Sequence, residues 1–270
     1  MTANSSASGD RGPKINITVP HSARIWNYWL GGKDNFAVDR QVGHQIREIN
    51  PAIVDIARAD RAFLGRAIQY LVGEAGIRQL LDIGTGLPTA DNTHEVAQRL
   101  APESRIVYVD NDPMVLVHAR ALLTSSPEGA CDYVEADVHD PKTILQEASR
   151  TLDFGQPIAL MLLAIVQFIL DDAEAVAVVQ QLVDAVPSGS YLVVSHATNE
   201  VNNEAMDAHL AHWNQHGTPK FTYRSRAQIA GYFDGLEVLE PGVVLLPYWR
   251  PEPGDEPMPM DGICAVGRKP

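Results

Sequence analysis

Glycine and aspartate residues follow three apolar segments of the chain in an order that suits a nucleotide-type ligand. Gly84 and Gly86 follow the first segment, Asp110 ends the second, and Asp137 follows the third. The carboxyl ends of parallel strands meet at one edge of a sheet, where α/β proteins bind their ligands. Glycine lets the backbone turn tightly and leaves no side chain between the main chain and a ligand. The spacing therefore predicts a nucleotide-binding edge.

Two ligand classes use a glycine-bearing turn after the first strand and an acid at the end of the second. Dinucleotide enzymes add a third glycine three residues further on and direct the turn at a pyrophosphate. Here that position is Thr89, and the preceding Pro88 has no N–H to donate. S-adenosylmethionine has no phosphate and needs a carboxylate for its ribose and a polar group for its adenine. The residues favour S-adenosylmethionine, with Asp110 on the ribose and Asp137 on the adenine amino group.

Further residues near the same strand ends complete the predicted cofactor site. Val138 packs beside the adenine ring in this interpretation, and Thr85, Asn111 and Ala164 flank the ligand. Arg61, on a helix that precedes the sheet, is a candidate partner for the cofactor's carboxylate through a charge-assisted contact. A solvated surface position for Arg61 is the alternative, and the sequence leaves both open.

Lys33 lies in the loop GGKDN at residues 31–35. In one interpretation the N-terminal helices form a lid, and Lys33 reaches the cofactor or the substrate. In the other the loop is a simple connector, since glycine and asparagine are common turn residues. Lys33 is kept as a candidate cofactor-binding residue.

Histidine residues raise the questions of a general base and of a metal. His196, at the end of the fifth predicted strand, is a candidate base for a hydroxyl or amine acceptor, or simply a polar strand end. His209, His212 and His216 share one helical face, a spacing that suits a metal ion. No cysteine or carboxylate pattern reinforces that site, and methyl transfer from a sulfonium requires no metal. No metal is therefore predicted, and no other catalytic residue is identified.

The hydrophobic pattern predicts the elements that position these residues. Apolar runs alternate with amphipathic helices from residue 77, which is typical of a parallel sheet with helices on both faces. Two further strands have no helix between them, so an antiparallel hairpin is expected. The prediction is a doubly wound, mostly parallel, Rossmann-like sheet of seven strands with a C-terminal antiparallel hairpin and an N-terminal helical lid. The strands are expected at residues 79–83, 105–112, 131–140, 157–169, 190–198, 236–246 and 262–267.

Three helices are expected before the sheet, because apolar residues recur there at intervals of three and four. Their ranges are 23–30, 36–49 and 52–74. The chain is accordingly divided into a flexible tail at 1–20, a helical cap at 21–75 and a cofactor-binding domain at 76–270.

Composition limits the partners of the protein. The formal net charge of −13 opposes binding to nucleic acids and anionic membranes, because each phosphate contact needs a cation. The two cysteines cannot form a disulfide framework, and the polar N-terminus lacks the apolar segment of a signal peptide. The longest apolar run, residues 158–170, is shorter than the roughly 20 residues of a membrane-spanning helix. A cytoplasmic monomer or homodimer is expected.

Several motifs resemble those of known families. LDIGTG, YVDND and EADV, with the terminal hairpin, resemble class I S-adenosylmethionine-dependent methyltransferases over residues 77–267. ARIWNYWLGGKDNFAVDR, ARADRAFLGRAIQYL and DIGTGLPTADNTHEVAQ resemble an actinobacterial family of S-adenosyl methyltransferases formerly carried as a domain of unknown function. This second resemblance spans nearly the whole chain and implies the fold and the cofactor, but no substrate. The chain departs from the family pattern at Asp60, where asparagine is usual, and at Gln167, where histidine is common.

The hypothesis is a methyltransferase that moves the methyl group of S-adenosylmethionine to a small-molecule acceptor by in-line displacement. One alternative is a nicotinamide-dependent oxidoreductase on a similar sheet. Another is a sensor that keeps the fold and the cofactor pocket but transfers nothing. The residues do not specify the acceptor.

Overall fold

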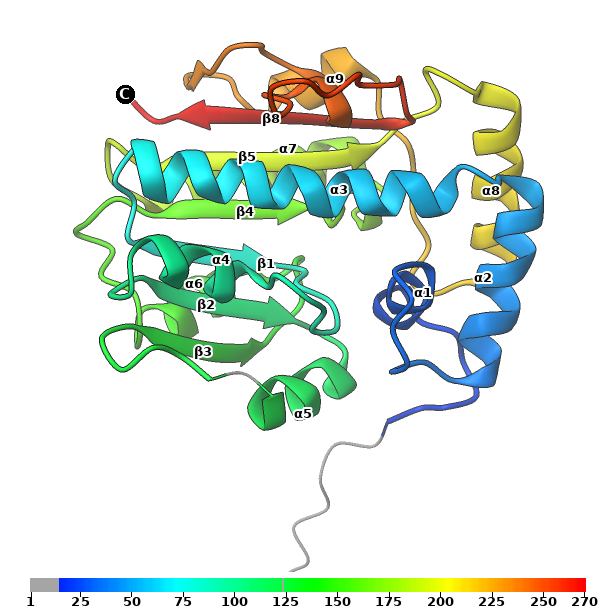
Figure 1. The fold of residues 1–270 in the computed structure, drawn as a ribbon, viewed down its shortest axis with the longest axis horizontal. Coiled ribbons are helices and arrows are strands. Elements are labelled where there is room, and N and C mark those ends of the chain that lie inside the picture. The colour runs from blue at the N-terminus through cyan, green and yellow to red at the C-terminus, as the bar shows by residue number, and fades with distance from the viewer. Residues whose placement is uncertain (1–14, 123) are drawn as a thin grey trace, which may run out of the picture.

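A central sheet organises the molecule, which a computed structural model describes over residues 15–122 and 124–270. The strand order is β3-β2-β1-β4-β5-β8-β6, with β7 also paired to β8 (Figure 1). Strands β1 to β5 are parallel, and β8 is antiparallel to its neighbours. This arrangement of strands confirms the predicted fold class. Residues 1–14, which make up most of the predicted tail, lie outside the described residues. The strands are β1 Gln79–Ile83, β2 Arg105–Asp110, β3 Ala130–Glu135, β4 Ala159–Leu163, β5 Tyr191–Ala197, β6 Glu237–Val238, β7 Val244–Leu245 and β8 Gly262–Arg268.

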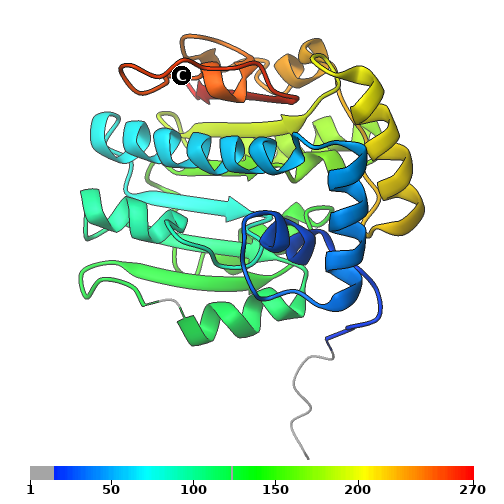
Figure 2. The same cartoon turned by 45° about the vertical axis from the view of Figure 1, so that its right-hand side comes forward.

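Helices cover both faces of the sheet. They are α1 Ser22–Trp29, α2 Ala37–Ile49, α3 Ile53–Ile68, α4 Thr93–Leu100, α5 Pro113–Leu122, α6 Pro141–Ala148, α7 Asp172–Ala185, α8 Asn203–His216 and α9 Arg226–Gly231. Helix α3 crosses one face, and α6 and α7 lie on the other (Figures 1 and 2). Within the described ranges, every helix is too short or too polar to cross a lipid bilayer.

The two central strands, β1 and β4, are buried along their whole length. Leu81 belongs to an apolar cluster that includes Val179 of α7, and Leu80 belongs to a second cluster that includes Phe63 of α3. A parallel strand covered on both faces must be apolar on both faces. This explains why the continuous apolar runs in the sequence form the middle of the sheet.

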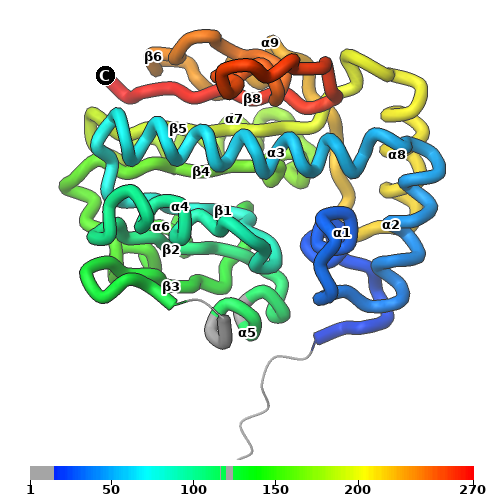
Figure 3. Tube along the Cα trace, viewed as in Figure 1, coloured from blue at the N-terminus to red at the C-terminus, as the bar shows by residue number. Residues whose placement is uncertain are grey.

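A helical layer made of α1, α2 and α8 lies beside the carboxyl ends of the parallel strands (Figures 1 and 3). Its apolar side chains form a separate cluster in which Ile25 of α1, Ile46 of α2 and Trp213 of α8 are buried. The layer thus joins the N-terminal helices to a helix from the C-terminal half of the chain. It covers the edge of the sheet at which the sequence predicts a ligand.

The C-terminal hairpin differs from the prediction of one strand at residues 236–246. That strand is split into β6 and β7, so the sheet contains eight strands rather than seven. The chain advances six positions from Val238 to Val244, while the paired strand β8 advances only three, from Gly267 to Cys264. The extra residues bulge out at Pro241, which lacks an N–H for a ladder, and Gly242, which has a φ of +89°.

A buried carboxylate fixes the start of α1. Asp39, which is fully buried, accepts hydrogen bonds from the backbone N–H groups of His21 at 2.9 Å and Phe36 at 2.8 Å. The Nε atom of Arg24 lies 3.3 Å from the same carboxylate. This group of contacts ties α1 to α2 and sets the position of α1 over the strand ends.

We predict that Asp39→Ala lowers the free energy of unfolding by about 3 kcal/mol, because it leaves buried Arg24 with only the more distant carboxylate of Asp112, at 4.0 Å. Urea denaturation of the full chain measures the loss. Asp55→Ala is the control, because Asp55 forms only an exposed ion pair with Arg58 and should cost at most about 0.5 kcal/mol. Equal losses for the two variants would contradict the assigned role of Asp39.

Candidate functional site

A cavity of about 150 Å³ lies at the carboxyl ends of β1, β2 and β4, between the sheet and α1. We call it the first cavity. Nine of the residues predicted from the sequence line it, and they come from four strand ends and from α3. They are Arg61, Gly84, Thr85, Gly86, Asp110, Asn111, Asp137, Val138 and Ala164.

The glycine turn after β1 forms the floor of the first cavity. Gly84 has a φ of +78° and donates its N–H to the carbonyl of Val109 at 2.8 Å. Gly86 has a φ of +65° and donates its N–H to Oδ2 of Asp110 at 2.8 Å. A Cβ atom at Gly84 would lie 2.6 Å from the side chain of Ile165, so the segment after β4 approaches the turn closely. Glycine is thus required at position 84 by both conformation and space.

Three buried carboxyl groups surround the first cavity. Burial raises the pKa of Asp60 and of Asp82 to about 6 and also raises the pKa of Asp110. Thr93 donates its hydroxyl to Asp82 at 2.6 Å, and the nearby Arg61 guanidinium lowers the pKa of both Asp60 and Asp82 in part. A cationic ligand at this end of the cavity would stabilise the charged form of these carboxyls, so the cluster favours a cationic ligand.

The Arg61 guanidinium already forms hydrogen bonds within the protein. One of its Nη atoms donates to the carbonyls of Ala90 at 3.1 Å and Asp91 at 2.9 Å. These bonds hold the guanidinium at the rim of the first cavity, near the loop between β1 and α4.

The Asp137 carboxylate is held in place at the other end of the first cavity. Asn111 donates to it at 2.8 Å, and the backbone N–H of His139 donates to it at 3.0 Å. Partial burial raises the pKa of Asp137, but the hydrogen bonds from His139 and Asn111 outweigh that effect and bring the pKa below its ordinary value. Asp137 is therefore an ionised acceptor with a fixed orientation.

Two predicted residues lie elsewhere. Lys33 is exposed and does not line the first cavity, because its loop folds back onto Asn27, which accepts the N–H of Asp34 at 3.0 Å. His196 lines a neighbouring cavity, but its Nδ1 donates to the carbonyl of Ala197 at 2.8 Å and its Nε2 accepts from Arg224 at 3.3 Å. Burial lowers its pKa to about 4. His196 therefore has no free lone pair for the proton of an acceptor.

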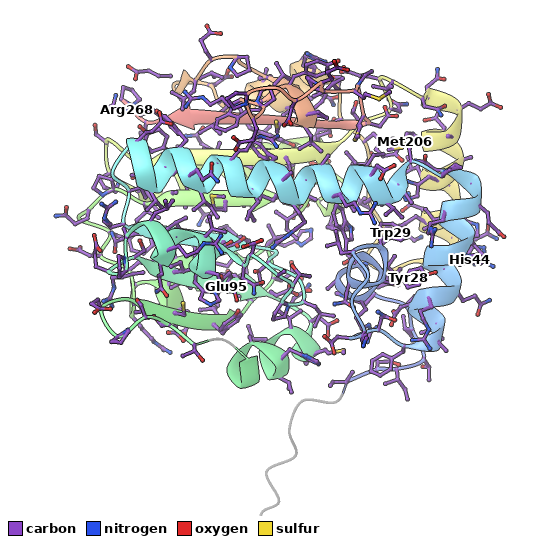
Figure 4. All side chains as sticks on the ribbon, viewed as in Figure 1. Tyr28, Trp29, His44, Glu95, Met206 and Arg268 are labelled. Carbon is purple, nitrogen blue, oxygen red and sulfur yellow. The ribbon has the colours of Figure 1, made fainter. Side chains whose placement is uncertain are left out.

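The neighbouring cavity, which we call the second cavity, has a volume of about 40 Å³ and shares Trp26, Asp60, Ala164 and Phe168 with the first. Five of its lining residues are tryptophan or phenylalanine. Trp29 and Met206, which also line it, lie on the side of the molecule formed by α1, α2 and α8 (Figure 4).

The three histidines that share a face of α8 do not form a cluster of metal ligands. His209 is buried in the second cavity, whereas His212 lies 3.2 Å from Gln45, and its ring is 4.5 Å from that of His216. Over residues 15–122 and 124–270, no group of three or more histidine, cysteine or acidic side chains has the arrangement of a metal site.

Sequence reasoning missed several residues that line the first cavity. Asp82 is the one acidic residue in the buried strand β1, and a buried carboxylate is costly without a compensating partner. His21, Trp26 and Asn27 reach the cavity from α1 and the residue before it, and no local pattern indicates which face of this helix meets the sheet. His139 follows Asp137 closely, so its proximity was available from the sequence.

Comparison with known proteins identifies similar chains. A family model described as S-adenosyl methyltransferase matches residues 8–270. A DUF574 family protein from Streptomyces avermitilis is 43% identical, with a TM-score of 0.91, over 95% of this chain and 100% of that one. A proposed methyltransferase from Thermobifida fusca is 35% identical, with a TM-score of 0.86, over 98% and 99%.

A more distant structure shares the fold alone. The S-adenosylmethionine-dependent methyltransferase from Anabaena variabilis is 15% identical, with a TM-score of 0.52, over 96% of this chain and 98% of that one. A search of curated proteins found no match.

The two glycines of the turn provide a matched pair of variants. Gly86→Ala introduces only the strain of a positive φ, about 1–2 kcal/mol, because no atom lies within 4 Å of a Cβ at that position. Gly84→Ala adds the displacement of Ile165, at a further cost of about 1–3 kcal/mol. We therefore expect Gly84→Ala to have the lower free energy of unfolding in urea, and the reverse order would contradict the close approach described here.

Proposed function

The chain belongs to the S-adenosyl methyltransferase family, and on that premise we propose that it methylates a small-molecule acceptor by in-line displacement. The cofactor is S-adenosylmethionine. The observation that carries the proposal is the convergence of Gly84, Asp110 and Asp137 on one cavity at adjacent strand ends.

The residues present fit the cofactor by charge and by shape. The cofactor has a cationic sulfonium and an ammonium group, which suit a cavity bordered by Asp60, Asp82 and Asp110. In the proposed arrangement, Asp110 accepts hydrogen bonds from the ribose and Asp137 from the adenine amino group. Val138 lies beside the adenine ring, while Thr85, Asn111 and Ala164 complete the walls. The amino-acid end lies near the glycine turn and Arg61.

The residues 21–75 are proposed to act as a cap on a methyltransferase domain at 76–270. Trp26 and Asn27 of α1 line the first cavity from the side opposite the strand ends. A cap in this position excludes water and holds two reactants in line. Orientation of this kind contributes about 7–11 kcal/mol to lowering a barrier in favourable cases.

The chemistry supplied by the bound cofactor is an activated methyl group on a sulfur that leaves readily. The protein therefore needs to bind, orient and exclude water rather than to generate a strong nucleophile.

Isothermal titration with S-adenosylhomocysteine and with NAD tests the cofactor assignment. We expect S-adenosylhomocysteine to bind and NAD not to bind. Asp110→Ala should weaken S-adenosylhomocysteine by tenfold to a hundredfold, because a charged hydrogen bond contributes about 1.5–3 kcal/mol. Asp184→Ala, on the exposed face of α7, is the control. Binding of NAD alone, or unchanged affinity in Asp110→Ala, would reject the assignment.

A single-turnover assay tests transfer itself. The protein is loaded with S-adenosylmethionine carrying a labelled methyl group and is mixed with a small-metabolite extract. Appearance of label in a small molecule supports an enzyme, whereas binding without any labelled product supports a sensor.

The raised pKa values of Asp60 and Asp82 predict how cofactor affinity depends on pH. Both carboxyls are ionised above pH 6 and become neutral below it. The Kd of S-adenosylmethionine should therefore increase between pH 7.5 and pH 5 by about tenfold for each of these carboxylates that faces the sulfonium, since a carboxylate with a pKa near 6 is then mostly protonated. S-adenosylhomocysteine, which lacks the sulfonium charge, should weaken less. Parallel titrations at the two pH values measure the difference, and identical changes for both ligands would argue against these carboxyls facing the sulfur.

A further inference from the structure

The second cavity lies directly beyond the first. The two share Asp60 and Ala164, together with the aromatic side chains of Trp26 and Phe168. A molecule in the second cavity therefore contacts the same side chains as the cofactor. This is the position that an acceptor needs in order to meet a methyl group held in the first cavity.

The size of the second cavity limits its occupant. Its volume is about 40 Å³, against about 150 Å³ for the first, so it is roughly a quarter as large. The second cavity therefore takes a smaller group than the first.

The walls of the second cavity favour an aromatic ring. Trp29 and Trp213 lie with their ring centroids 6.1 Å apart, and Trp213 and Phe221 lie 5.5 Å apart. Three of the four tryptophans in the chain, Trp26, Trp29 and Trp213, line this cavity. The Trp213–Phe221 pair is edge-to-face, and contacts of this kind stabilise aromatic pairs beyond the burial of apolar area.

Most polar groups of the second cavity already have protein partners. Gln167 accepts the N–H of Ala197 at 3.1 Å, and Ser195 accepts the N–H of Ala164 at 3.0 Å. Asp261 accepts the N–H groups of Val201 and Asn202. His196 is engaged at both ring nitrogens, as described above. These hydrogen bonds fix the orientation of the groups in the wall.

His209 is different, because neither of its ring nitrogens has a hydrogen-bond partner among the described residues, although it is only 4% exposed. Its ring lies against Trp29, Trp213 and Phe221, with centroids 5.6–6.2 Å away. A buried polar group without a partner costs about 1–3 kcal/mol. A ligand with a hydrogen-bonding group at this end of the cavity would recover that energy.

Asp60 is the ionisable group at the junction of the two cavities. It is 7% exposed, and the Ser195 hydroxyl and the Arg61 guanidinium lie near its carboxyl. At pH 7–8 it is ionised and acts as an acceptor for an N–H or O–H group. No other carboxyl lines both cavities.

We propose that the second cavity is the acceptor site, and that it takes a single aromatic ring with a nucleophilic hydroxyl or amino group at Asp60 and a second polar group at His209. This inference rests on the proposed function. The lone pair of the acceptor oxygen or nitrogen forms a bond to the methyl carbon, the carbon–sulfur bond breaks, and its electron pair stays on sulfur. The proton of the acceptor passes to the carboxylate of Asp60.

Isothermal titration of the full chain, saturated with S-adenosylhomocysteine, tests the site without relying on turnover. The probes are phenol and aniline, the three dihydroxybenzenes, the three aminophenols, and cyclohexanol as the non-aromatic control. We expect the ring compounds to bind more tightly than cyclohexanol. At least one disubstituted isomer should bind about tenfold more tightly than its monosubstituted parent, the gain of one added hydrogen bond. Tryptophan fluorescence should change in parallel.

Variants separate the two polar contacts. His209→Phe should remove the tenfold preference for the disubstituted ring over its monosubstituted parent and leave the affinity for phenol or aniline unchanged. If His209→Phe does not fold, His209→Asn takes its place. His216→Asn, at an exposed position on the same helix, is the control. Asp60→Asn, loaded with S-adenosylmethionine at a saturating concentration, should slow single-turnover methylation of the preferred probe at least a hundredfold. Its control is Asp55→Asn on the same helix.

Each outcome has a distinct meaning. If S-adenosylhomocysteine does not bind, the proposed function fails and this inference with it. If it binds but no ring compound binds more tightly than cyclohexanol, the cofactor assignment stands and the acceptor site is overturned. If both His209 variants still bind the disubstituted ring more tightly than its monosubstituted parent, the role of His209 is overturned. Unchanged methylation in Asp60→Asn overturns the role of Asp60, and the proton NMR shift of the transferred methyl group distinguishes oxygen from nitrogen methylation.

Discussion

The burial of three carboxyl groups around one cavity is the constraint on which the rest of the site depends. Carboxylates removed from water are costly unless hydrogen bonds or positive charge compensate them. Asp110 is compensated by the backbone N–H groups of Gly86 and Asp112, and Asp82 by the hydroxyl of Thr93. Asp60 is compensated by the Ser195 hydroxyl and the Arg61 guanidinium. A cationic ligand would stabilise all three, so the fold tolerates this cluster at the point where a sulfonium is proposed to bind.

The helical layer covers the charged edge of the sheet, and two cavities with different lining residues lie between the layer and the sheet. Trp26 of α1 lines both, and α8 contributes Met206, His209 and Trp213 to the second. Because α1 and α8 come from opposite ends of the chain, the acceptor side is assembled only in the folded protein. The cofactor side, by contrast, is built mainly from strand ends and their turns.

This difference explains what the sequence predicts and what it does not. The bounds of β1 and the convergence of Gly84, Asp110 and Asp137 follow from local patterns and from the rule that parallel strands share one carboxyl edge. The second cavity depends on which face of α8 meets α1, and no local pattern encodes that contact. Lys33 was selected from loop composition alone, but the loop packs on Asn27 and directs Lys33 elsewhere.

A contact between residues that are distant in sequence also decides the role of His196. The sequence predicts that His196 lies at a strand end, but it does not predict its hydrogen-bond partner. Arg224, a buried residue distant in sequence, donates to His196 and to the carbonyls of Val166 and Ile169 at 3.1 and 2.6 Å. The guanidinium therefore fixes the segment that separates the two cavities, and it also occupies the lone pair that a general base would need. In the proposed reaction a proton must then go to another acceptor at the junction, and Asp60 is the carboxylate that lies there.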